Sequence, residues 1–90
     1  MSQAIVDPEE LRRFANNLKR FHAELQGQML ALGGQLKSLG NTWRDKEQQK
    51  FVDEFEQTTQ QVNRFLEAVE QHVPFLVRKA ERIEEYLRQR

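Results

Sequence analysis

The sequence has no cysteine, and this absence limits how so short a chain can be stabilised. Disulfides and thiolate zinc sites are both excluded. Ninety residues form one domain at most, spanning 1–90, and leave little interior for a hydrophobic core. Oligomerisation is therefore the leading source of additional stability. No apolar run approaches the roughly 20 residues that span a bilayer, so we expect no stable membrane insertion.

An excess of charge of one sign is also lacking. Lysine plus arginine and aspartate plus glutamate both number 14, so the formal net charge is zero. A chain without a strong positive field is not suited to phosphate backbones, and we expect no nucleic-acid binding. The first seven residues contain no positively charged leader followed by an apolar stretch, so we expect no signal peptide of the general pathway.

Residues suited to catalysis or metal binding are few and scattered. His22 and His72 are the only histidines, and in a hairpin that turns near residue 43 they would lie far apart. Neither helix pattern contains the Glu-x-x-His spacing of di-iron bundles. Ser2 and Ser38 have no base nearby in the sequence to activate them. We expect no enzyme, no cofactor and no metal site, with a histidine site formed across a dimer as the remaining alternative.

The sequence does contain two long helical patterns, one on each side of residue 43. Apolar residues recur at steps of three and four, which places them on one side of a helix. The first helix is predicted at about 8–39, because Asp7 and Pro8 form a start signal, and the second at about 46–89. Pro74 lies within the second pattern, whose register continues past it, so we expect a kink near Pro74 rather than an end.

Glycines interrupt the first helix and help to end it. Gly27, Gly33 and Gly34 each cost up to about 1 kcal/mol relative to alanine, and we favour close packing of a partner backbone as their reason. Gly40 and Asn41 can both adopt the left-handed conformation that terminates a helix.

The turn is predicted at about 40–45, and its motif is Trp43, Arg44 and Asp45. Asp45 can cap the second helix, and Trp43 would be a partly buried aromatic anchor. So short a connection places the two helices antiparallel.

The apolar surface exceeds what two helices can cover. Phe65 and Phe75 lie beside the main apolar row of the second helix and widen its face. We therefore predict an all-α fold, an antiparallel two-helix hairpin that dimerises into a four-helix bundle. The predicted core and dimer interface comprises Leu11, Phe14, Leu18, Phe21, Leu25, Leu32, Phe55, Val62, Phe65, Leu66, Val69 and Leu76.

These features resemble the WXG family of small helical hairpins, the early-secreted-antigen type exported by type VII (ESX) secretion systems. The resemblance rests on the entry at Asp7 to Arg12, the mid-chain Trp43, and a second-helix pattern comprising Phe51, Phe55, Val62 and Phe65. It implies a non-enzymatic secretion substrate or the partner of one. The partner would be a second copy in a homodimer or a paralogous hairpin in a heterodimer, with a secretion ATPase or a toxin as further candidates.

Two positions depart from the family pattern. Asp45 replaces the glycine expected two residues after the tryptophan. Tyr86 is followed four residues later by Arg90 instead of an acid, so the family's export signal is missing and a partner would supply it. The protein would be secreted by a type VII-like route, or would remain cytoplasmic. The alternative function is a cytoplasmic coiled-coil adaptor that holds a larger partner.

Overall fold

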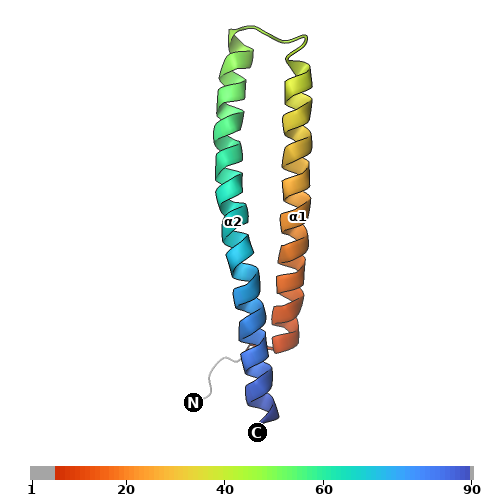
Figure 1. Ribbon diagram of the computed structural model, residues 1–90, viewed down its shortest axis with the longest axis vertical. Coiled ribbons are helices and arrows are strands. Elements are labelled where there is room, and N and C mark those ends of the chain that lie inside the picture. The colour runs from red at the N-terminus through yellow and green to blue at the C-terminus, as the bar shows by residue number, and fades with distance from the viewer. Residues whose placement is uncertain (1–5, 90) are drawn as a thin grey trace.

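The protein is an antiparallel hairpin of two long helices (Figure 1). In the computed structural model, which describes residues 6–89, α1 spans Pro8–Leu39 and α2 spans Lys46–Arg88. The hairpin measures 67 × 22 × 15 Å, and the described residues form no strand. The predicted all-α hairpin is confirmed. Ser2 and Arg90, both considered above, lie outside the described residues.

Each helix begins at an aspartate. The Asp7 carboxylate accepts a hydrogen bond from the Glu9 amide at 2.9 Å, and Pro8 occupies the first helical position. The Asp45 carboxylate accepts from the Gln48 amide, also at 2.9 Å. Both bonds satisfy amides that a helix start leaves without a partner. The capping role predicted for Asp45 is confirmed.

The end of α1 differs from the prediction. The left-handed conformation expected at Gly40 or Asn41 is wrong, because no described residue has a positive φ and Gly40 has a φ of −61°. The chain instead tightens through hydrogen bonds between residues three apart, from Asn41 to the Ser38 carbonyl and from Thr42 to the Leu39 carbonyl, both at 3.0 Å. Because these bonds end the helix with right-handed backbone angles, no residue in the left-handed conformation is needed.

Arg44 completes the turn. Its Nε donates to the Gly40 carbonyl at 3.1 Å, and its Nη2 donates to the Asn41 carbonyl at 2.9 Å. The positive charge of Arg44 also interacts favourably with the negative C-terminal end of the helix dipole. Within the turn motif, Arg44 therefore binds carbonyls just beyond the end of α1, and Asp45 caps the start of α2.

The seam, the row of side chains between the two helices, is fully buried only from its middle toward the end away from the turn. The four buried residues described there are Ala15, Leu66, Val69 and Ala80. Ala15 and Ala80 have no exposed surface. Figure 1 shows α2 leaning toward α1 in its C-terminal half. Small side chains at these two positions let the helices approach one another there.

Helix α2 continues through Pro74, as predicted. Proline has no amide hydrogen, so the Glu70 carbonyl lacks its usual helical donor. Pro74 itself is exposed, whereas Val73 and Leu76 on either side of it are partly buried. Packing of the seam on both sides of the proline keeps the helix continuous.

The glycines inside α1 leave room for a side chain. A Cβ atom added at Gly27, Gly33 or Gly34 would meet nothing within 4 Å. The close packing that we favoured for these glycines is therefore not made by α2.

Gly34→Ala is expected to raise the free energy of unfolding by about 1 kcal/mol, because the alanine restricts the unfolded chain and clashes with nothing. Thermal unfolding followed by circular dichroism measures the change. Gly40→Ala is the matched control, since a Cβ there would lie 3.2 Å from the Lys37 carbonyl, and we expect no gain. Destabilisation by Gly34→Ala would mean that another chain packs on this glycine.

Candidate functional site

Large apolar side chains that the seam leaves uncovered gather on one face of the hairpin. On α1 they are Phe14, Phe21, Leu32 and Leu39, which fall within about 20° of one another at the roughly 100° that each helical residue turns. On α2 they are Phe51 and Phe65. Their exposed fractions run from 45% for Phe51 to 56% for Phe14. We call these six residues the apolar band.

An aromatic contact joins the two halves of the band. The rings of Phe21 and Phe65 lie with centroids 6.2 Å apart at an interplanar angle of 78°. This edge-to-face arrangement is a favourable geometry for two aromatic rings. Because the contact crosses between α1 and α2, the band extends over both helices.

The turn adds a second aromatic contact to this surface. Trp43 is partly buried, and its ring centroid lies 6.0 Å from that of Phe51. Phe51 in turn stacks with Phe55, with centroids 6.2 Å apart. A shallow hollow around Trp43 and Phe51 is bordered by Glu47, Lys50 and Glu54. The predicted anchor thus packs on the first turns of α2.

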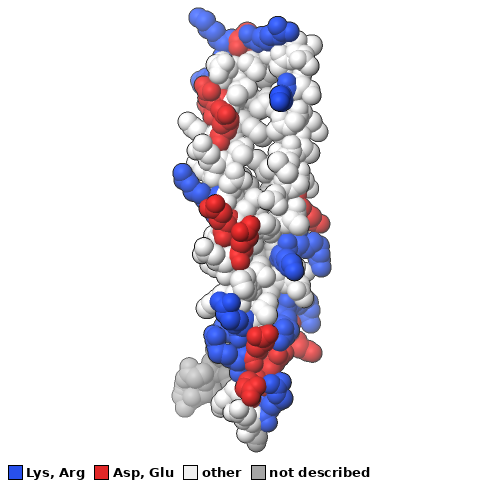
Figure 2. Space-filling model, viewed as in Figure 1, with Lys and Arg blue, Asp and Glu red and all other residues white. Residues whose placement is uncertain are grey.

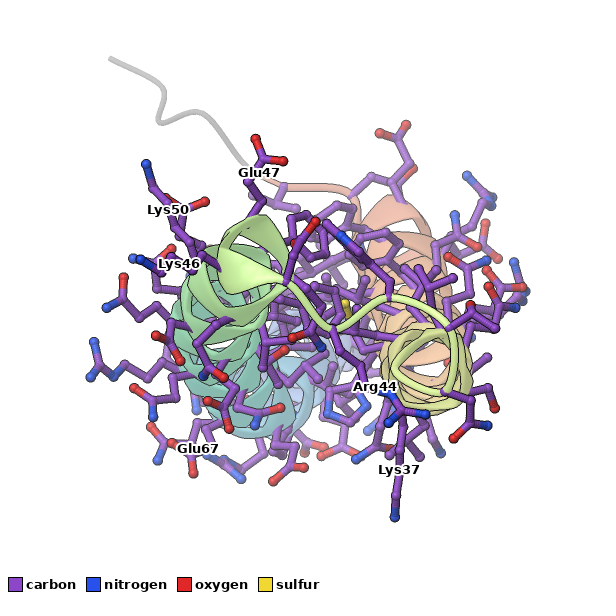
Figure 3. All side chains as sticks on the ribbon, turned by 90° about the horizontal axis from the view of Figure 1, so that it is seen from above. Lys37, Arg44, Lys46, Glu47, Lys50 and Glu67 are labelled. Carbon is purple, nitrogen blue, oxygen red and sulfur yellow. The ribbon has the colours of Figure 1, made fainter. Side chains whose placement is uncertain are left out.

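Charged side chains mark the other side of the hairpin. Figure 3, viewed from above, shows Lys37 and Glu67 pointing to one side and Glu47 and Lys50 to the opposite side. Figure 2 shows the side that carries Lys37, with charged side chains densest in the half away from the turn. We call this side the charged face.

Among the described residues, an ion pair and a contact between a histidine and a carboxylate bridge the helices. Arg12 donates from Nη2 to Glu84 Oε1 at 2.7 Å and from Nε to Oε2 at 3.0 Å. The hydrogen bond from Arg12 lowers the pKa of Glu84 below its ordinary value. In the second contact, His22 Nε2 lies 3.2 Å from Glu70 Oε2. These contacts fix the register of α1 against α2.

A groove of about 580 Å³ opens between the helices near the turn. Leu36, Val52 and Phe55 contribute apolar lining, and Gly33 leaves space beside them. Lys37 lines the edge of the groove and points to the charged face, so the groove opens on that face. Nothing in its lining offers an activated nucleophile or a grouped set of metal ligands.

The described residues offer no centre for metal chemistry. No three His, Cys, Asp or Glu side chains within residues 6–89 are grouped so that they could hold an ion. His72 is exposed, whereas His22 is mostly buried beside Glu70. Within the same residues, neither helix has a stretch long and apolar enough to cross a membrane.

The predicted core and interface residues divide between the seam and the band. Leu66 and Val69 are buried in the seam. Partly buried members are Leu11, Leu18, Leu25, Phe55, Val62 and Leu76. Exposed members, all in the apolar band, are Phe14, Phe21, Leu32 and Phe65. The hairpin thus brings Phe21 and Phe65 together and separates Phe14 from Leu32 along α1.

Sequence reasoning gave Arg44 no role of its own. Arg44 binds two carbonyls just beyond α1. The one feature of the sequence that could have indicated this is a basic residue just after a predicted helix end. Ala15 was also missed, because alanine was not counted among the apolar residues of α1.

Comparison with known proteins supports the resemblance drawn from the sequence. The sequence model of WXG100, described as proteins of 100 residues with WXG, matches residues 3–86. A crystal structure of the wild-type secreted protein EsxB from Bacillus anthracis str. Sterne is 33% identical, with a TM-score of 0.80, and the match covers 94% of this chain and 99% of that one. Another, of selenomethionine-labelled EsxB, is 32% identical with a TM-score of 0.77 over 96% of this chain and 98% of that one. A comparison with curated proteins found no match.

Proposed function

This chain belongs to the WXG100 family, and on that basis we propose that it pairs with another hairpin through its apolar band and serves type VII secretion as a substrate or as the partner of one. The whole chain, 1–90, acts as a single non-enzymatic hairpin domain. Its binding partners are a second copy or a paralogous hairpin, and then a toxin or a secretion ATPase.

The exposed apolar band is the observation that carries this proposal. Leaving several large apolar side chains in water forgoes about 1.5 to 3 kcal/mol for each one that could be fully buried. Six such side chains lie on one face of the hairpin and are at least 45% exposed. A monomer rarely leaves an apolar surface of this kind without a binding role. WXG100 proteins form dimers, and EsxB is a secreted protein, so both parts of the proposal fit the family.

The charge at residue 90 supports a partner-dependent route. The family signal needs an acid four residues after a tyrosine, and Arg90 has the opposite charge at that distance from Tyr86. A receptor surface that binds an acid would repel this side chain. The signal therefore comes from a bound protein that carries it.

We expect the chain to stay inside cells when it is expressed alone beside an intact type VII system, and to be exported together with a signal-bearing partner. Arg90→Glu should restore some independent export, because it supplies the missing acid. Immunoblots of medium and cell fractions measure the exported share. Arg88→Glu is the control, since it makes the same charge change two residues before the signal position.

Efficient export of the unaltered chain alone would contradict the signal argument. Failure of export with every protein encoded nearby would favour the cytoplasmic adaptor instead.

A further inference from the structure

We propose that the outer side of α2, the side away from α1, adsorbs to the surface of an anionic lipid bilayer. Its arginines bind the lipid phosphates, and Phe75 and Tyr86 lie among the headgroups. This surface differs from the apolar band, so the inference goes beyond the proposed pairing and does not depend on it.

A second row of side chains runs along α2, which we call the outer row. Its members follow one another at steps of three and four and are Arg64, Ala68, Gln71, Phe75, Arg78 and Arg82. Each comes two positions after a buried or partly buried residue of the seam, and two such positions are about 200° apart around a helix. The outer row therefore points away from α1. Arg64 and Phe65 of the band are adjacent and so about 100° apart, which separates the two surfaces.

The outer row carries positive charge that the rest of the described hairpin leaves unpaired. Arg64, Arg78 and Arg82 are exposed, and none of them forms an ion pair with another described residue. Lys79, which is partly buried, adds a fourth cation on the band side of the row. Four cations on one side of a helix suit a surface of phosphates.

The acids in this part of α2 lie off the outer row. Glu70 and Glu81 each come directly before a member of the row and so lie about 100° from it. Glu67 points to the charged face (Figure 3). Glu85, which would continue the row, is paired with Arg88 at 2.6 Å. The sequence mixes both signs of charge here, but the helix separates them.

Two large aromatic rings accompany the cations. Phe75, within the row, is 50% exposed, and Tyr86, about one turn beyond Arg82, is 62% exposed. Neither ring takes part in the aromatic contacts described above. Aromatic rings are favourable at the level of lipid headgroups, where the ring leaves water and a tyrosine hydroxyl stays hydrated.

A bilayer fits the outer row better than a nucleic acid or an acidic protein does. The row is a straight, convex strip about 27 Å long, and a bilayer offers phosphates at every point of a plane, so no matching groove is needed. A nucleic acid is favoured by a long-range positive field, which a chain of zero net charge lacks. Attraction that acts only within about 10 Å turns the outer row toward the lipid.

Vesicle binding tests the inference. The chain should bind vesicles of one part phosphatidylglycerol to two parts phosphatidylcholine, and should bind phosphatidylcholine alone far more weakly. Arg78→Gln and Arg82→Gln should each weaken partitioning about fivefold, the contribution of one cation close to an anionic surface. Phe75→Ser should weaken it by about fivefold as well, without any change of charge. Cosedimentation with the vesicles measures partitioning.

Matched controls lie on other sides of the hairpin. Lys37→Gln removes a cation from the charged face, and Leu30→Ser removes an apolar side chain that is 74% exposed on α1. Both should leave partitioning unchanged. Circular dichroism of every variant checks that the helices remain folded.

The absence of cysteine allows a readout of orientation. Gln71→Cys places a single thiol in the outer row, and Ser38→Cys places one on the side of α1 away from α2. A polarity-sensitive fluorophore attached at position 71 should shift its emission to the blue with anionic vesicles. The same fluorophore at position 38 should not shift.

Several results would overturn the inference. They are equal partitioning into both kinds of vesicle, partitioning that Arg78→Gln and Arg82→Gln leave unchanged, and equal emission shifts at positions 71 and 38. Binding of polyglutamate or duplex DNA through the same arginines, without vesicle binding, would assign the row to an acidic protein or a nucleic acid instead. None of these results concerns the apolar band, so the proposed function is decided separately by the export experiment.

Discussion

Leu66→Ala is expected to lower the free energy of unfolding by about 3 kcal/mol, the largest stability loss that we predict for a single change. Leu66 is 4% exposed and is the largest of the four buried residues described. The cavity would lie in the only half of the described seam that is fully packed. Small domains have little stability to lose, so a large part of the population should unfold near room temperature. Urea unfolding followed by circular dichroism measures the change at fixed protein concentration.

Leu30→Ala is the matched control for this experiment. Leu30 is 74% exposed and points away from the seam, so the same substitution should change stability by less than about 0.5 kcal/mol. Equal losses for the two variants would show that burial in the seam does not determine the cost of the substitution, because alanine is at least as good a helix former as leucine.

Phe65→Asp is expected to weaken pairing by about 100-fold or more while leaving the chain largely helical. Phe65 is 46% exposed in the hairpin and contacts Phe21 at the middle of the band. Aromatic side chains at the centre of an interface commonly dominate its binding energy, and a buried carboxylate there would lose its water. Sedimentation equilibrium over the micromolar range measures the dissociation constant.

The control for Phe65→Asp again uses Leu30. Around α1, Leu30 lies about 180° from Phe21, so Leu30→Asp introduces the same charge on the opposite side of the helix. We expect it to pair like the unaltered chain. A Phe65→Asp variant that pairs equally well would remove the band as the binding surface.

The hairpin itself could be predicted because its signals are local. Helix caps at Asp7 and Asp45 act within three residues, and the apolar steps of three and four continue through Pro74. The conformation of Gly40 could not be predicted in this way. Glycine permits both signs of φ, and the bonds made by Arg44 and by the tightened turn decide between them.

The division of the apolar residues into seam and band also needed the structure. Periodicity shows that Phe21 and Leu25 lie on the apolar side of α1, but it does not show which of them α2 covers. That depends on how closely the helices approach, which Ala15 and Ala80 determine through their small size. The predicted residues could therefore be named, but their separation into buried and exposed rows could not.

The uneven packing of the seam has a mechanical consequence. All four buried residues described lie between the middle of the hairpin and the end away from the turn, and three of them belong to α2, with Leu66 and Val69 near its midpoint and Ala80 further toward its C-terminal end. A pulling force applied at the C-terminal end of α2 therefore meets Ala80, Val69 and Leu66 before it reaches the loosely packed half of the hairpin. Unravelling from this end should require its peak force early and proceed with little resistance once Leu66 is released. A motor that threads the chain from that end would have to overcome one early barrier.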